Sequence, residues 1–178
     1  MLTIDLAAGL LLYTFVEYAH HRWGGHTTWL RSLRRSHGAH HRDPQEGGVR
    51  FTTKLVERAP LVAKLMLLFG AAFALVLPLA HAGVVLAGLL GGYLYSEWFH
   101  HRMHHVWPRT AVGRFLWRHH YIHHFVDGHV NYGFTSPLWD IVLFTWRREP
   151  SVAVPAHRVP DPDRSVVGIE VRARRARA

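Results

Sequence analysis

Cysteine is absent from this 178-residue sequence, and acidic residues are scarce. The lack of cysteine excludes a disulfide framework and every metal site that is built from thiolates. Aspartate and glutamate number 12 against 21 lysines and arginines, which gives a formal net charge of +9 at pH 7. A chain that is this basic and also 49% hydrophobic indicates either a nucleic acid or a membrane surface as its partner.

Basic residues are missing from two long stretches of the chain. The first arginine is Arg22, and no lysine or arginine lies between Lys64 and Arg102. Basic and apolar blocks therefore alternate, as loops and spans do in a bilayer. Nucleic-acid-binding proteins usually carry their basic residues on the elements of the folded core. The arrangement therefore favours a membrane and argues against nucleic acid as the partner.

Three apolar stretches predict membrane-spanning helices: residues 2–19, 59–80 and 82–99. Each is close to the length of about 20 residues that a spanning helix requires, which favours spans over the buried helices of a soluble protein. The second and third stretches meet at LPLAHAG, where proline and glycine predict a tight turn between two helices. We therefore predict an all-α integral membrane protein with about three spanning helices.

The basic segments predict the orientation of these spans. The basic residues of 22–58, of 102–118 and of the C-terminal tail all fall on the side where the first span exits. By the positive-inside tendency this side is the cytoplasm, and the N-terminus faces the opposite compartment. Of the 17 histidines, only His81 falls outside the predicted cytoplasmic side.

This topology predicts two segments of different character. Residues 1–148 are expected to form a membrane-embedded domain with a histidine-rich helical cap on its cytoplasmic side. The apolar stretch 138–146 of the cap is expected to lie along the membrane interface, where its tryptophans are favoured. Residues 149–178 are expected to be a basic, loosely ordered tail whose arginine-rich end attracts anionic lipid headgroups.

Most histidines gather in four short clusters: HRWGGH, HGAHH, HHRMHH and HHYIHH. Residues three or four apart share one face of a helix, so the last three clusters each point two or three imidazoles in one direction. These histidines are His37, His40 and His41; His100 and His104; and His120, His123 and His124. His21 and His26 are five apart, so we expect the helix to end near Gly24 and the chain to bend there.

Such a concentration of imidazole indicates a metal site, because neutral imidazole is the commonest metal ligand in proteins. One ion uses at most about six ligands, so ten well-placed histidines indicate two metal ions. Without metal, packed histidines would repel one another if protonated and would be costly if buried without partners. Imidazole suits iron, copper, nickel and zinc alike, so the residues leave the metal open.

Other interpretations of the histidines are weaker. A metal transporter or store would place ligands within the spans, but the predicted spans carry histidine only at their ends. A zinc hydrolase of the HExxH type is unsupported, because that motif is absent. His81 and His157 stand alone and are interpreted as ordinary surface or core residues without a metal-binding role. Glu17 and Glu97 precede histidines by one helical turn, and we expect them to accept hydrogen bonds from imidazole N–H groups, the alternative being ordinary interfacial carboxylates.

Four segments of the chain resemble, in this order, the histidine boxes of the fatty acid hydroxylase superfamily. They are EYAHHRWGGH, HGAHH, HHRMHH and HHYIHHFVDGHVNYGFTSPLWDIVLFT. That superfamily of membrane enzymes includes fatty acid 2-hydroxylases, sterol desaturases and carotenoid hydroxylases. The resemblance covers about residues 13–146. It implies a dinuclear metal centre that uses dioxygen and two electrons, with iron in the active enzyme and zinc as the alternative in a purified sample. The ligands implied by the boxes are His21, His26, His37, His40, His41, His100, His104, His120, His123 and His124.

The resemblance leaves several neighbouring residues open. His105 could replace His104 as a ligand, because the carotenoid enzymes have a longer spacing in that box. The further candidates beside the boxes, as extra ligands or as partners of the ligands, are His101, His105, His119, His129, Asn131 and Asp140.

The activity that the resemblance implies is that of a monooxygenase acting on a lipid. The substrate class stays open between fatty acyl, sterol-like and carotenoid lipids, and a lipid desaturase with the same metal centre is the alternative. Nothing like the haem-binding motif of a fused cytochrome domain is present in this sequence. The expected electron donor is therefore a separate protein of ferredoxin or cytochrome type.

Overall fold

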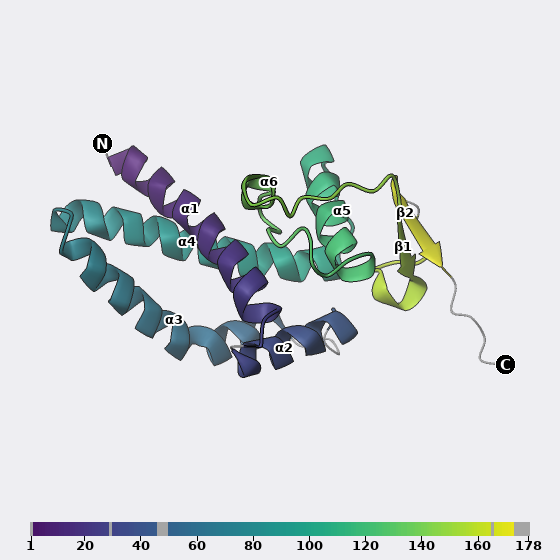
Figure 1. Cartoon of the computed structure of the whole chain (residues 1–178), viewed down its shortest axis with the longest axis horizontal. Coiled ribbons are helices and arrows are strands. Elements are labelled where there is room, and N and C mark those ends of the chain that lie inside the picture. The colour runs from purple at the N-terminus through teal and green to yellow at the C-terminus, as the bar shows by residue number, and fades with distance from the viewer. Residues whose placement is uncertain (1, 29, 46–49, 165, 173–178) are drawn as a thin grey trace. The chain divides into compact units, whose positions relative to one another are not determined.

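The computed structural model describes residues 2–28, 30–45, 50–164 and 166–172 of the chain, and most of them are helical (Figure 1). The helices are α1 Leu2–Ala19, the π-helical η1 His20–Gly25, α2 Arg31–Arg42, α3 Phe51–Ala74, α4 Leu79–His105, α5 Ala111–Phe125, α6 Leu138–Val142 and the 3₁₀ turn η3 Ala156–Arg158. Two short strands, β1 Val152–Pro155 and β2 Ile169–Arg172, pair in parallel. The expected all-α class is therefore correct in the main and wrong for the C-terminal segment, which adds this small sheet.

The chain divides into two compact units, which we call the apolar unit and the histidine unit. The apolar unit holds α1 up to Glu17, α3, and α4 up to Trp98. The histidine unit holds the chain from Tyr18 to the loop after α2, and everything from Phe99 onward.

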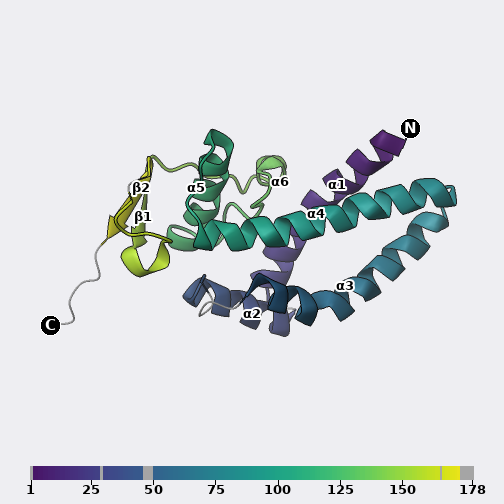
Figure 2. The ribbon, with the colours of Figure 1, turned by 180° about the vertical axis from the view of Figure 1, so that it is seen from behind.

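Within the apolar unit, α3 and α4 form a helical hairpin, as predicted, but its turn covers residues 75–78 and so lies earlier than the predicted LPLAHAG (Figure 2). An ion pair between Arg58 of α3 and Glu97 of α4 joins the two helices far from the turn. Helix α1 packs on α4 with the two backbones in close contact. A Cβ on Gly9 would lie 2.1 Å from the Val85 carbonyl oxygen, so only glycine fits there.

Two helices in the described part of the chain are apolar and long enough to cross a membrane: Leu2–Gly25 and Leu79–His105. The predicted span over residues 59–80 is not among them. Helix α3 begins at Phe51 and ends at Ala74, so its apolar part shares the helix with Glu57, Arg58 and Lys64. The described structure thus contains two such helices where the sequence predicted three.

The histidine unit has its own apolar core. Trp117, Tyr121 and Ile122 of α5 pack with Met103 of α4 and with the two inward-facing valines of β1. Thr110 caps the start of α5 by accepting a hydrogen bond from the Gly113 amide at 3.0 Å. The segment after residue 149 was expected to be loosely ordered, but Val152 and Val154 of β1 are fully buried. The arginine-rich end beyond Arg172 lies outside the described residues.

Candidate metal centre

Ten histidines of the histidine unit converge in two groups of five. In each group every member offers one ring nitrogen, and these nitrogens all lie within 4.8 Å of one another. The first histidine group is His21, His26, His37, His41 and His123. The second histidine group is His40, His100, His104, His120 and His124. The members are the ten histidines that the sequence motifs indicated as ligands, and each group could hold a metal ion.

Helix periodicity divides the histidines between the two groups. On α2, His37 and His41 are one turn apart and point into the first group, whereas His40 points into the second. On α5, the neighbours His123 and His124 go to different groups. The two groups therefore adjoin, and α2 and α5 each supply ligands to both.

The bend that brings His26 back toward His21 is a π-helical turn, η1. Its i to i+5 hydrogen bonding brings residues five apart close together, which an α-helix would not do. The ring centroids of His21 and His26 lie 5.5 Å apart. Gly25 ends this turn, and a Cβ there would lie 2.9 Å from the ring of His37. The predicted helix end near the glycine pair is confirmed, but the π-helical geometry was not expected.

Distances in the first group fit coordination better than hydrogen bonding. The Nε2 atom of His37 lies 3.2 Å from that of His21, and 2.8 Å from those of His26 and His41. A neutral imidazole nitrogen carries either one hydrogen or one lone pair, so it cannot satisfy three such neighbours. Two nitrogens bound at right angles to one ion at about 2.1 Å lie about 3.0 Å apart. The convergence therefore fits lone pairs directed at a common cation.

The second group has the same character. The Nε2 atoms of His104 and His120 lie 3.0 Å apart, and both rings are fully buried. Among the described residues, neither ring nitrogen of His124 has a hydrogen-bond partner, although both are buried. A buried polar atom without a partner is costly, and metal coordination removes that cost.

The surroundings keep these imidazoles neutral. Burial lowers the pKa of His26 to about 4 and that of His41 to about 3. Burial, followed by repulsion from neighbouring histidines, holds the pKa values of His120, His123 and His124 well below the ordinary range of histidine. Neutral imidazole is the form that binds a metal ion, so the donor set is ready to bind at neutral pH.

Backbone carbonyls orient two members of the first group. His123 donates its Nδ1–H to the Val130 carbonyl at 2.7 Å, and the Nδ1 of His21 is bonded to the Tyr132 carbonyl. With Nδ1 held in this way, Nε2 is the nitrogen that points into the group. The carbonyls belong to the loop that follows α5.

Comparison with known proteins agrees with this geometry. The family model described as "Fatty acid hydroxylase" matches residues 6–145, which contain all ten clustered histidines. The chain belongs to the fatty acid hydroxylase family.

Individual members of the family resemble the chain over most of its length. The dihydroceramide fatty acyl 2-hydroxylase FAH2 of Arabidopsis thaliana is 32% identical over 79% of this chain and 59% of its own. The fatty acid 2-hydroxylase of Mus musculus is 33% identical over 77% of this chain and 38% of its own. This chain thus spans between about two fifths and three fifths of the length of these relatives.

A solved structure described as full-length scs7p, with only its hydroxylase domain visible, has the same fold. It superposes with a TM-score of 0.65 at 28% identity, covering 83% of this chain and 56% of its own.

Several residues near the family's boxes lie outside both groups. His104, not its neighbour His105, belongs to the second group, whereas the ring of His105 stacks on that of His101 at 4.0 Å. His129 is exposed and lies 3.4 Å from Asp127. Glu97 pairs with Arg58, and Glu17 is buried in α1. The predicted role of Glu17 as an acceptor for imidazole stays a prediction.

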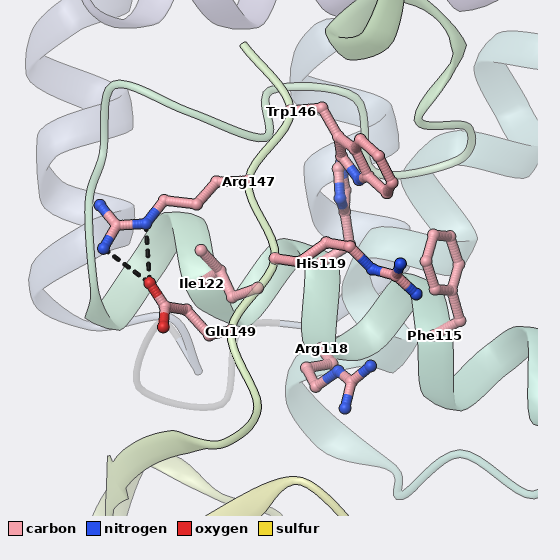
Figure 3. A pocket seen from close by; sticks show the side chains of 8 residues that line it. Phe115, Arg118, His119, Ile122, Trp146, Arg147 and Glu149 are labelled. Carbon is pink, nitrogen blue, oxygen red and sulfur yellow. Dashed lines mark hydrogen bonds and ion pairs between the residues drawn. The ribbon is translucent and has the colours of Figure 1, made fainter.

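His119, Asn131 and Asp140 form a separate buried set. His119 donates from Nε2 to Asp140 at 3.1 Å and also lines a shallow pocket with Phe115, Ile122 and Trp146 (Figure 3). Asn131 donates to the His119 carbonyl at 3.1 Å. Sequence reasoning named these residues as candidates, but it missed the carbonyl acceptors, because a backbone carbonyl has no signature in the sequence.

Proposed function

We propose that this chain is the metal-binding catalytic part of a membrane-bound lipid hydroxylase. The observation that carries the proposal is the pairing of two five-histidine groups in a member of the fatty acid hydroxylase family. The similar proteins named above are fatty acid and dihydroceramide fatty acyl 2-hydroxylases, which favours a fatty acyl chain over a sterol or a carotenoid as the substrate.

The two histidine groups would hold one metal ion each, and we propose iron in the active enzyme. When bound, the metal pair supplies the activation of dioxygen that breaking an unactivated C–H bond requires. The overall reaction inserts one oxygen atom into a C–H bond and reduces the other to water, consuming two electrons and two protons. We propose that a separate protein of ferredoxin or cytochrome type delivers the electrons.

An aromatic side chain beside both groups supports an apolar substrate. The ring of Phe134 stacks on His100 of the second group at 4.6 Å and lies 6.0 Å from His21 of the first. It also lies 5.8 Å from His120. Such a ring offers an apolar surface, and no competing ligand, at the place where a reacting carbon must approach. We propose that Phe134 lines the path of the acyl chain.

We further propose that α3 crosses the membrane together with the two helices that are apolar enough by composition. None of the described residues of α3 is buried, and Leu67 is 76% exposed. A helix whose apolar side chains point outward requires a lipid environment. With three spans, the distribution of the basic segments favours a metal centre on the cytoplasmic side and an N-terminus on the opposite side.

Expression of the full chain in a lipid-rich host tests the proposed activity. Cells grown under ¹⁸O₂ should accumulate acyl lipids that gain one labelled oxygen, and cells without oxygen should not. Replacing His120 by Ala removes a ligand and should abolish the product, whereas replacing the exposed His157 should leave it unchanged. Lipids that lose two hydrogens and gain no oxygen would identify a desaturase instead and refute the proposed hydroxylation.

A further inference from the structure

Asp140 lies at the centre of a network that ends at the first histidine group. Its side chain is fully buried and receives hydrogen bonds from four groups. Oδ1 accepts from the Tyr132 amide and the Thr145 hydroxyl, each at 2.8 Å. Oδ2 accepts from the Gly133 amide at 2.8 Å and from His119 at 3.1 Å. Hydrogen bonds to an ionised carboxylate are among the stronger ones in proteins, so this arrangement fixes the loop at residues 132 and 133.

The fixed loop is the one that orients ligands. The amide of Tyr132 bonds to Asp140, and the carbonyl of the same residue accepts from His21. Two residues earlier, the Val130 carbonyl accepts from His123 at 2.7 Å. Asp140 therefore acts on two ligands, from different segments of the chain, through one short piece of backbone.

A second connection reaches the helix that carries His21. The Thr145 hydroxyl, which donates to Asp140, is bonded to the Tyr18 hydroxyl at 3.0 Å. Arg22 donates to that tyrosine oxygen at 2.7 Å. Tyr18 and Arg22 lie on either side of His21 in the sequence, so hydrogen bonds connect the carboxylate to the side chains that flank this histidine.

The backbone of the loop after α5 adopts a conformation that few residue types tolerate. Asn131 has a φ of 55°, in the left-handed region, where asparagine is tolerated and most residues are not. Its side chain compensates by donating to the His119 carbonyl and to the Arg147 carbonyl, at 3.1 and 3.0 Å. Gly133 admits no side chain, since a Cβ there would lie 2.3 Å from the Ser136 carbonyl oxygen.

At His120, a member of the second histidine group, Nδ1 is not held in the way that Nδ1 of His21 and His123 is. Among the described residues, the Nδ1 of His120 has no hydrogen-bond partner, although it is buried. The loop bonds to His21 and His123, and both belong to the first group. The link from Asp140 through these loop carbonyls therefore leads to the first group.

We infer that Asp140 is a positioning residue that selectively maintains the metal affinity of the first histidine group, by way of the loop carbonyls of Val130 and Tyr132. The inference rests on the proposed function, because it assumes that the histidine groups bind metal. Groups that orient metal-binding imidazoles typically contribute about 10- to 100-fold to metal affinity, which sets the expected size of the effect.

The experiment measures Co²⁺ binding to the purified full chain in two backgrounds. The first background carries His104→Ala and His120→Ala, which disable the second histidine group and leave the first intact. The second background carries His37→Ala and His41→Ala, which disable the first histidine group and leave the second intact. Adding Asp140→Ala should weaken Co²⁺ binding about 10- to 100-fold in the first background and leave it unchanged in the second. The visible spectrum of bound Co²⁺ should change in the first background alone.

Two further variants keep the test decisive. Asp127→Asn removes a carboxylate near the same loop that ion-pairs with Arg147, and it should not alter binding in either background. If Asp140→Ala does not fold, Asp140→Asn keeps the size of the side chain but puts a donating NH₂ group where His119 and Gly133 also donate. It should weaken Co²⁺ binding less than Asp140→Ala does, and again in the first background alone. An equal loss in both backgrounds, or none in the first, overturns the inference. Failure of the unaltered chain to bind Co²⁺ would instead overturn the metal centre.

Discussion

The rings of His41 and His124 stack 4.2 Å apart and inclined by only 22°, although the two residues belong to different histidine groups. The two histidine groups are therefore in direct contact through this pair of rings. Because α2 and α5 each contribute histidines to both groups, a shift of either helix would disturb both groups together.

Gly25 is expected to be irreplaceable even by alanine. Its added methyl group would lie 2.9 Å from Cγ of the His37 ring, which has to move to accept it. We expect Gly25→Ala to lower metal content and activity together. Gly38→Ala on α2 is the matched control, because its methyl would meet only the end of the Arg42 side chain at 3.7 Å. Alanine there should stabilise the helix by about 0.5–1 kcal/mol without affecting the site. A fully active Gly25→Ala variant would contradict the proposed packing.

Metal-free protein should lose stability on acidification. The imidazoles of His26 and His41 have pKa values of about 4 and about 3 in the folded chain, against about 6.5 in an unfolded one. Between these values the unfolded state binds more protons than the folded state, so protons favour unfolding. The free energy of unfolding should be nearly constant above pH 6.5 and fall steadily from there toward pH 4. Denaturant unfolding followed by tryptophan fluorescence at each pH gives the free energy of unfolding. A free energy that stays constant or rises between pH 6.5 and pH 4 would contradict the prediction.

Single cysteines should report the orientation of the spans cleanly, because the natural chain has none. Leu75 is 87% exposed in the turn between α3 and α4, and His129 is exposed in the histidine unit. We expect a membrane-impermeant thiol reagent applied to intact cells to label Leu75→Cys and to leave His129→Cys unlabelled until the cells are opened. The reverse pattern would invert the topology proposed from the basic segments.

Phe134 should control where the substrate is oxidised. Its ring lies beside His21, His100 and His120, and it is not itself a metal ligand. Replacing it by alanine should leave metal content unchanged but spread hydroxylation over neighbouring carbons, because the acyl chain gains room beside the metals. Mass spectrometry of the hydroxylated products gives the positions. Loss of metal with unchanged position would show instead that Phe134 only supports the ligands.

Sequence patterns indicated which histidines come together, for a physical reason, but the expectation that each cluster points in one direction is wrong for α2 and α5, whose histidines divide between the two groups. Imidazoles three and four residues apart on a helix must share a face, so the clusters on α2, α4 and α5 needed no tertiary information. The division of His40 from His41 between two groups could not be foreseen, because it depends on where the neighbouring helices lie. Nor could the π-helical turn at His20–Gly25, since nothing in the local composition separates it from an ordinary bend.

Other features depended on long-range contacts. The strand Val152–Pro155 is stabilised by burial of its valines against α5, whereas the sequence predicted a loosely ordered tail there. Helix α3 ends at Ala74, earlier than its apolar run suggested, which removed it from the helices that qualify as spans by composition. The roles of the Val130 and Tyr132 carbonyls depend on tertiary geometry and on no side chain.

The metal content of the purified full chain, measured before and after chelation together with activity, tests whether hydroxylation depends on metal ions held by the two histidine groups. We expect two ions per chain, complete loss of hydroxylation when both are removed, and its return when Fe²⁺ is added back. Full activity in protein stripped of metal would contradict the account.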